Sequence, residues 1–388
     1  MTAADVTSIA GLRAAARKRA ERLQVNSRIA TTLLVVVVVL IVIGLGATQS
    51  ASSAVGIDQA QDRFYFFKRQ LIGVGIGTVA LLVASRVPYR FYRKVALPMF
   101  VATLGLLVAV LAVGPVIGGA RRWLPVAGFT FQPSEIAKIS IVFTLAFLLE
   151  RKHKLLSSFG HFLAPIAFVV GTIAILVVKQ PDLGTTIIIG AAALAVILAS
   201  DAPLKYVALL TMGAIAAVAF LALSDQYRAD RIVGFLDPWG NSSGEGYQLI
   251  QGYYALSNGG IFGVGLGASR ARWFYLPNAH TDFIFAIIGE ETGLVGALTI
   301  IGLFVALAVT GWLVAVRAPD RFGRMVAAGI TMWLSFQALV NIGGVLGVIP
   351  ITGIALPFVS FGSTGLIMSM AALGVLVNIA QSGVERKT

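Results

Sequence analysis

The stretch that decides the fold is IATTLLVVVVVLIVIGLGAT, residues 29–48, in which twenty consecutive residues carry no charge. As an α-helix with a rise of 1.5 Å per residue it would be about 30 Å long, which matches the hydrocarbon thickness of a bilayer. A helix on the surface of a soluble domain would show a polar face, and this stretch has none. The stretch therefore predicts a membrane-spanning helix.

The rest of the chain shares this apolar character. Of its 388 residues, 57% are hydrophobic and 12% are charged, and the mean hydropathy is +0.88. A soluble domain carries roughly 25% charged residues, so the apolar surplus must face lipid. Several runs of about 20 apolar residues favour helices over a barrel. The absence of cysteine from the sequence excludes disulfides and thiolate metal sites.

We expect an all-α polytopic integral membrane protein with about ten transmembrane helices. The predicted spans are residues 29–48, 70–87, 95–114, 135–150, 161–179, 183–200, 206–224, 283–316, 325–348 and 364–381. The eighth is too long for a helix perpendicular to the membrane, so we expect it to tilt or to extend beyond the bilayer. The first span is expected to be an uncleaved signal anchor, because the basic lead before it is longer than the n-region of a signal peptide.

The distribution of basic residues orients the spans. With the N-terminus inside, the inner segments are 1–28, 86–94, 151–160, 201–205, 317–324 and 382–388, and they hold 19 of the 30 Lys and Arg residues. This asymmetry places both termini in the cytoplasm. It also accounts for the net charge of +13 without a nucleic-acid partner.

Three regions follow from this topology. Residues 1–28 are a basic cytoplasmic segment, residues 29–381 a single transmembrane domain, and residues 382–388 a short cytoplasmic tail. Residues 225–282 form a long extracytoplasmic loop between helices 7 and 8. A loop of this length is usually functional or disordered, and its content of aromatic residues, Gly and Pro suggests re-entrant or interfacial helices. Its run of alternating glycines at 263–267 is a weak candidate for a nucleotide loop, since no strand precedes it and no Walker lysine follows.

Ionisable residues at membrane depth mark function by default. Glu135 and Lys138 lie three residues apart and share one face of the fourth span, although a local ion pair is an equally good interpretation. Asp182 is best interpreted as the cap of the sixth span. Glu290 and Glu291 need partners or water inside an apolar helix, so we expect both to bond to neighbouring helices.

Asp282 stands at the start of the eighth span, in AHTDFIF, residues 279–285. In one interpretation Thr281 is the N-cap and Asp282 lies in the first turn, facing the positive end of the helix dipole. In the other, Asp282 is a functional carboxylate held at the membrane surface beside the long loop. The residue types alone do not separate these two interpretations.

Five segments resemble the SEDS family (shape, elongation, division and sporulation), whose best-known members are FtsW and RodA. They run in family order over nearly the whole chain: Arg122-Trp123 with FQPSEIAK at 131–138, QPDLG at 180–184, GYQ at 246–248, LPNAHTDFIF at 276–285, and PITG at 350–353 through PFVSFG at 357–362. The stretch AHTD at 279–282, followed by IIGEE at 287–291, is more similar to FtsW than to RodA. The chain departs from the family pattern at Asn241, Gly252 and Ser363-Thr364, and the first departure puts in doubt any role for an acid at 241.

The resemblance implies a peptidoglycan glycosyltransferase that polymerises lipid II into β-1,4 glycan strands at the outer face of the cytoplasmic membrane. The configuration at the anomeric carbon would invert, and undecaprenyl pyrophosphate would leave. The implied partners are a class B penicillin-binding protein, which is a transpeptidase, and other membrane proteins of the divisome. The implied location is the division septum of the cytoplasmic membrane.

The family's catalytic aspartate maps onto Asp282, either as general base towards the acceptor hydroxyl or as a metal ligand. Lys138 and Glu135 complete the implied catalytic group. Positive charge for the pyrophosphate would come from Lys138, Arg122, Arg228, Arg231 or a divalent cation, Mg²⁺ or Mn²⁺. No nucleotide is needed, because the activated bond arrives with the lipid. The implied substrate-binding residues are Arg122, Trp123, Gln132, Ser134, Asp182, Arg231, Gln248, His280 and Thr281.

This assignment contains a physical tension. A helix N-terminus and a nearby Lys138 would both lower the pKa of Asp282 and weaken it as a base, whereas partial desolvation would raise it. Two other functions compete with the enzyme. A lipid II flippase could use the same polar residues, but these concentrate on the outer side and the inner loops look short and merely basic. A scaffold that only recruits the transpeptidase leaves Asp282 and Lys138 unexplained.

Overall fold

The computed structural model describes residues 3–382 apart from 127, 157, 225, 245 and 274, and it describes side chains from residue 24 onward except at 226–228. The predicted tail therefore lies, beyond Ser382, outside the described residues. The described elements are α1 (Ala3–Ala60), α2 (Tyr65–Arg86), α3 (Phe91–Val113), β1 (Leu124–Val126), β2 (Phe129–Phe131), α4 (Pro133–Arg151), the 3-10 helix η1 (His153–Leu155), α5 (Phe159–Val178), α6 (Leu183–Leu198), α7 (Leu204–Leu223), α8 (Gln226–Leu236), α9 (Tyr247–Gly259), α10 (Ile284–Arg317), α11 (Arg321–Val345) and α12 (Ser363–Ser382).

The ten predicted spans correspond to α1–α7 and α10–α12, which confirms an all-helical polytopic membrane protein. Within the described residues, eight of these helices are long and apolar enough to cross a membrane. Of the other two, α6 is apolar but has only 16 residues, and α4 carries Glu135, Lys138 and Glu150. In addition, α1 starts at Ala3, so the basic segment continues the first span as one helix from that residue on.

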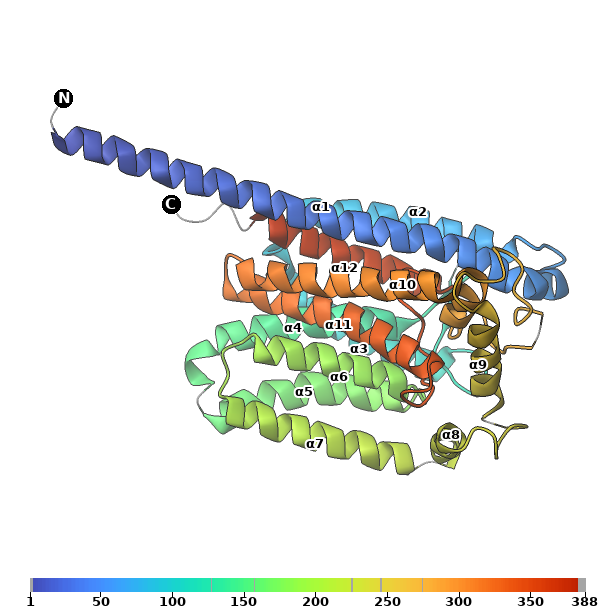
Figure 1. Cartoon of the computed structure of the whole chain (residues 1–388). Helices are drawn as coiled ribbons and strands as arrows, with labels where there is room; N and C mark the ends of the chain where they lie inside the picture. Colours follow the sequence, from blue (N-terminus) through green and yellow to red (C-terminus); the bar gives the residue numbers. More distant parts are fainter. Residues whose placement is uncertain are drawn as a thin grey trace.

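The long helices run side by side, and the loop before α10 covers one end of the bundle (Figure 1). In that loop α9 lies across the bundle end rather than along it, and α8 follows the end of α7. The predicted helices within the long loop are thus present as α8 and α9. The start of α1 and the end of α12 lie at the opposite end of the bundle, as the predicted topology requires.

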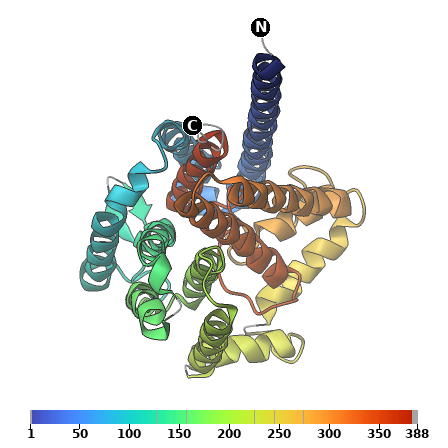
Figure 2. The same ribbon diagram turned by 90° about the vertical axis from the view of Figure 1, so that its left-hand side faces the viewer.

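The centre of the bundle is formed by α4 and α11, which pack against each other and against α6. Trp333 and Phe143 are among the largest fully buried side chains there. By contrast, α7 lies at the edge of the bundle (Figure 2) and has Val207 as its buried residue. Apart from Lys205 at its start, the exposed side chains of α7 are apolar, Met212 and Phe220 among them, and we infer that this surface faces lipid.

The eighth predicted span needs a correction, because α10 is not one continuous helix. Gly293 has φ 68° and ψ −163°, which divides α10 into helical segments 284–292 and 294–317. Only glycine adopts this backbone conformation readily. The span is therefore divided near its outer end into a short and a long helical segment, and the tilt or extension of the long segment stays a prediction.

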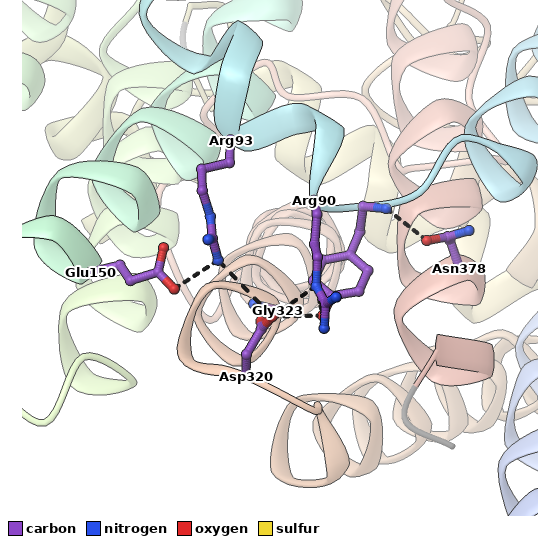
Figure 3. Close-up of polar contacts among 7 residues, drawn as sticks. Arg90, Arg93, Glu150, Asp320, Gly323 and Asn378 are labelled. Carbon is purple, nitrogen blue, oxygen red and sulfur yellow. Dashed lines mark hydrogen bonds and ion pairs between the residues drawn. The ribbon is translucent and has the colours of Figure 1, made fainter. Parts of the chain in front are cut away.

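At the end of the bundle where α1 begins, a polar network joins four elements (Figure 3): Tyr89, Arg90, Arg93, Glu150, Asp320, Gly323 and Asn378. Asp320 caps α11 and accepts from the Tyr89 hydroxyl at 2.8 Å. Arg93 Nη2 lies 2.8 Å from Glu150 Oε1 at the end of α4. These contacts hold the helix ends together on the side of the molecule away from Asp282.

Candidate functional site

Asp282 lies in a tight turn that ends where α10 begins. Asn278 adopts a left-handed conformation with φ 53°, and its carbonyl accepts from the backbone N–H groups of Thr281 and Asp282, both at 3.1 Å. The N-cap residue is Phe283, no side chain caps it, and no acid lies in the first turn of α10. The capping interpretation of Thr281 and Asp282 is therefore wrong.

The turn is held from behind by α11 and by the loop 346–362 that follows it. Asn341 Nδ2 donates to the Asp282 carbonyl at 2.8 Å. Ser360 Oγ donates to the Thr281 carbonyl at 2.6 Å, and the Phe361 N–H donates to the His280 carbonyl at 3.0 Å. Because these bonds use backbone carbonyls, they fix the turn and leave the Asp282 carboxylate free for chemistry.

Asp282 lines a small pocket that Phe283, Asn341 and residues 351–354 also line. A second small pocket beside it is lined by Arg231, Gln248 and other residues of α8 and α9. Ile351 lines both pockets. The arrangement places a carboxylate and a guanidinium group in adjacent hollows at the end of the bundle.

Burial and charge act on Asp282 in opposite directions. Asp282 is half-buried, open to the pocket and otherwise enclosed by protein, and burial raises its pKa to about 6. Arg231 and, more weakly, Arg122 lower this pKa, while Asp182 adds to the rise. Desolvation outweighs the cations, so the tension noted from the sequence is resolved in favour of a carboxyl that can accept a proton near neutral pH.

Arg122 and Asp182 belong to one connected cluster beside Asp282. Arg122 Nε donates to the Gln180 carbonyl at 2.9 Å and its Nη2 donates to the Pro181 carbonyl, which ties the segment before β1 to the turn between α5 and α6. Asp182 caps α6 through the Thr185 N–H at 3.0 Å, so its capping interpretation is confirmed.

Gln132 and Ser134 extend this cluster to the start of α4. Gln132 Nε2 donates to Ser134 Oγ at 3.0 Å and reaches Asp182 Oδ2 at 3.4 Å. Trp123 is half-buried next to Arg122. The side chain of Arg228, the other basic candidate for the pyrophosphate, lies outside the described residues.

The structure places Glu135 and Lys138 together but deeper in the bundle. Lys138 is 1% exposed, and its Nζ lies 2.7 Å from Glu135 Oε1 and 2.9 Å from Gln337 Oε1. The ammonium also faces the ring of Trp333, 5.2 Å from its centroid. None of these partners is Asp282, so the expected direct neighbourhood of Lys138 and Asp282 is wrong. The connection is indirect, because Gln337 Nε2 donates to the Ala355 carbonyl in the loop behind Asp282 at 2.8 Å.

His280, Thr281 and Gln248 surround the turn. His280 lies against Phe66 and Phe361, with ring centroids 4.8 and 5.8 Å away, and burial lowers the pKa of its imidazole to about 4. The ring is therefore neutral at pH 7. The Thr281 hydroxyl donates to the Asn278 carbonyl at 3.2 Å and lowers the pKa of Asp282. Gln248 Nε2 donates to the Pro277 carbonyl at 3.1 Å.

Sequence reasoning missed the residues that hold the site from behind. Gln337 and Asn341 are one helical turn apart in the ninth predicted span, and Gln70 donates from α2 to the Ser360 carbonyl at 3.0 Å. The available signal was a pair of carboxamides at i and i+4 in an otherwise apolar span, because polar groups at membrane depth need a partner.

The expected Mg²⁺ or Mn²⁺ does not fit as a resident metal. Among the described residues no group of three or more His, Asp or Glu side chains is close enough to hold one. Asp182, the acid that acts on Asp282, already accepts from the Thr185 N–H and hydroxyl. Arg231 and Arg122 would also oppose a cation beside Asp282.

Comparison with known proteins identifies the chain's relatives. A family model described as "Cell cycle protein", which groups FtsW, RodA and SpoVE, matches residues 30–384. The chain belongs to this family, the SEDS proteins. The family predicted from the sequence motifs is confirmed, and with it the likeness to FtsW, because relatives with that name match over 90% of the chain.

Individual relatives are similar to this chain in sequence over almost their full length. A Geobacter metallireducens protein named probable peptidoglycan glycosyltransferase FtsW is 38% identical over 90% of this chain and 93% of its own. Stage V sporulation protein E of Bacillus subtilis is 39% identical over 90% of this chain and 96% of its own. A solved structure described as "Structural coordination of polymerization and crosslinking by a peptidoglycan synthase complex" superposes with a TM-score of 0.73 at 27% identity, covering 90% of this chain and 97% of that one.

Proposed function

We propose that this chain polymerises lipid II into β-1,4 glycan strands at the outer face of the cytoplasmic membrane. It is a peptidoglycan glycosyltransferase of the SEDS family, as the family match and the relatives with that name indicate. The observation that carries the proposal is Asp282, a half-buried carboxyl with a pKa of about 6 that opens into a pocket at the end of the bundle and has no capping role.

Asp282 acts as the general base in this proposal. It takes the proton of the 4-hydroxyl of the acceptor N-acetylglucosamine while that oxygen attacks the anomeric carbon of the donor N-acetylmuramic acid. One C–O bond forms, the bond to the pyrophosphate breaks, and undecaprenyl pyrophosphate leaves with the electron pair. The donor linkage is α and the product linkage is β, so one displacement without a covalent intermediate accounts for the inversion.

The leaving pyrophosphate needs positive charge, and Arg231 is the best-placed group. It lines the pocket next to Asp282, and its charge is the strongest of those that act on the Asp282 carboxyl. Arg122 adds a second, weaker charge, although its nitrogens already bind two backbone carbonyls. A divalent cation stays a prediction, and it would arrive on the substrate pyrophosphate, because Mg²⁺ is usually bound by one or two carboxylates together with substrate phosphates.

In this proposal Lys138 and Glu135 are not the catalytic residues that the sequence analysis had expected, but stabilise the structure around the site. Lys138 fixes Gln337, and Gln337 fixes the loop at Ala355 behind the Asp282 turn. In this proposal the buried pair keeps that loop in place and does not touch the substrate.

The partner and the location are also proposed. A polymerase at the outer face must pass its strand to a crosslinking enzyme, so we propose a class B penicillin-binding protein, a transpeptidase, together with other divisome membrane proteins at the division septum. The solved relative described as a complex of polymerisation and crosslinking supports the first, and the family description "Cell cycle protein" supports the second.

The test is polymerisation of lipid II by the purified chain, alone and with a co-purified transpeptidase. Glycan strands longer than a disaccharide unit, resolved on a gel, are the expected product, and the complex should turn over faster than the isolated chain. A purified complex that moves lipid II across vesicle membranes without forming strands would contradict the proposed polymerase. It would support the alternative function, a lipid II flippase.

A further inference from the structure

The break in α10 is filled by a segment from the preceding loop. The N–H groups of Leu294 and Val295, which would bond within a continuous helix, donate instead to the carbonyls of Gly260 and Ile261 at 2.9 and 3.2 Å. The carbonyls of Glu290 and Glu291 in turn accept from the N–H groups at 264 and 265 at 3.0 and 3.1 Å. The first part of α10 is thus bonded to the loop and separated from the lipid-facing part.

The approach of the two backbones leaves no room for side chains at the contact. A Cβ added to Gly263 would lie 2.1 Å from the Glu291 carbonyl oxygen, and one added to Gly293 would lie 2.4 Å from the Gly263 nitrogen. Both glycines also have positive φ. The short helix 284–292 and residues 260–265 therefore form one closely packed unit.

Asp282 precedes this short helix directly, and Glu290 lies about two turns further along it. Residues 284–291 are all buried, so the short helix is enclosed on every side. A shift of its axis would move the Asp282 turn with it, because the turn continues into the helix without a flexible link.

The Glu290 carboxylate binds residues 269–271 of the loop that precedes Asp282. Glu290 is 1% exposed. Its Oε2 accepts from the Ser269 hydroxyl at 2.5 Å and from the Ala271 N–H at 3.3 Å, and its Oε1 accepts from the Arg270 N–H at 3.3 Å. Three donors at residues 269–271 thus converge on one buried carboxylate.

A second link joins the same loop to α1. Glu291 accepts from the Ser50 hydroxyl, and Ser50 Oγ accepts from Arg272 Nη1 at 3.2 Å. The prediction that both acids bond to neighbouring helices is confirmed for Glu291, which binds Ser50 of α1. It is wrong for Glu290, whose partners lie in the loop before α10. The two acids fix residues 269–272 from two directions, while the other end of the same loop is the Asp282 turn.

We propose that Glu290 is a positioning residue for Asp282: it fixes both the short helix that begins after Asp282 and the loop that leads to it. This inference rests on the proposed function, in which Asp282 is the general base. Glu290 touches neither substrate nor reacting atoms. Its effect is on the place of the Asp282 carboxylate, and a displacement of about 1 Å at a reacting group can reduce a rate about 10²-fold.

The experiment compares two carboxylates changed to carboxamides. Glu290→Gln keeps the size of the side chain but replaces one acceptor oxygen with a donor that faces an N–H group. Glu150→Gln is the matched control, because it weakens the ion pair with Arg93 at the opposite end of the bundle. Both variants lose thermal stability. In the complex with the transpeptidase, Glu290→Gln should lower kcat about ten-fold or more with KM changed little, whereas Glu150→Gln should keep both.

A second readout follows the position of residue 282 without any turnover. The chain has no cysteine, so Asp282→Cys supplies a single thiol, and its rate of modification by a methanethiosulfonate reagent measures its exposure. Adding Glu290→Gln should raise this rate several-fold, and adding Glu150→Gln should not. Ser269→Ala, which removes one of the three donors to Glu290, should also raise the modification rate, but by a smaller factor. It replaces Glu290→Gln in the experiment if that variant does not fold.

Unchanged modification rates together with a wild-type kcat in Glu290→Gln would overturn the proposal. So would a loss of kcat that Glu150→Gln reproduces at equal loss of melting temperature, because the effect would then be one of general stability. If the wild-type complex fails to polymerise lipid II, the proposed function is wrong, and the modification rates alone still decide whether Glu290 positions residue 282.

Discussion

Asn341 joins Asp282 to the loop behind it. Its side-chain amide donates one N–H to the Asp282 carbonyl at 2.8 Å and the other to the Ile354 carbonyl at 2.7 Å. Gln337, one helical turn earlier, binds the Ala355 carbonyl at 2.8 Å. Two carboxamides of α11 thus set the position of the Asp282 turn relative to the membrane-spanning bundle.

Asn341→Leu should therefore reduce polymerisation. The leucine side chain has a similar volume but leaves the carbonyls of Asp282 and Ile354 without a donor, at about 1–3 kcal/mol for each buried group. We expect kcat to fall about ten-fold or more as the turn shifts. Thr310→Val, which removes a hydroxyl bonded within the lipid-facing part of α10, is the control and should polymerise normally. Equal rates for the two variants would contradict a role of Asn341 in placing Asp282.

The buried ion pair of α4 predicts an unusual pattern of stability. Lys138→Met leaves Glu135 buried and uncompensated, which typically costs about 3–5 kcal/mol, so the melting temperature should fall sharply. The double variant with Glu135→Gln removes both charges and should recover much of that loss. Polymerisation should stay reduced in the double variant, since Gln337 Oε1 keeps only Trp333 Nε1 of the two donors that orient it. A double variant with wild-type turnover would show that the pair serves stability only.

The sequence predicted the helices well because the cause of each one is local. A run of some twenty apolar residues has few alternatives in a bilayer, and positions three apart share a helix face, which is why the pairing of Glu135 with Lys138 could be foreseen. The break at Gly293 could not, because the helix is interrupted by bonds to residues 260–265, which are distant in sequence. A glycine in an apolar helix is otherwise unremarkable in membrane proteins.

The site was predicted by resemblance more than by chemistry. Residue types alone allowed two interpretations of Asp282, a capping residue or a catalytic carboxylate. The turn at Asn278, which only the three-dimensional structure shows, excludes the capping role. From the sequence we also expected a nearby Lys138 to lower the pKa of Asp282. The structure shows that Lys138 points to α11 instead, and the positive charges near Asp282 come from Arg231 and Arg122, which belong to other segments.

The pKa of Asp282 predicts how stability depends on pH. Burial raises it from 3.8 to about 6 in the folded chain, so between these values the folded state binds more protons than the unfolded state. The free energy of unfolding therefore falls as the pH rises through this window and stays lower above it. Asp282→Asn removes the buried charge, so the variant should melt at a higher temperature than the wild type at pH 7.5 in detergent. The two should melt alike near pH 4, and a difference that is independent of pH would contradict the raised pKa.

Asp282→Asn should nevertheless abolish polymerisation, and this separates catalysis from folding. The carboxamide has nearly the same shape, so the turn, membrane insertion and partner binding should persist, but it cannot accept a proton, and loss of a general base typically lowers the rate about 10²–10⁴-fold. The wild-type rate should itself fall as the pH drops through about 6, as the carboxyl becomes protonated. Asp237→Asn is the control, because Asp237 lies in the same long loop and its carboxylate binds the Gly240 N–H in a local turn. It should keep most of the activity. If purified Asp282→Asn forms glycan strands at the wild-type rate, the base lies elsewhere and the assignment of Asp282 is wrong.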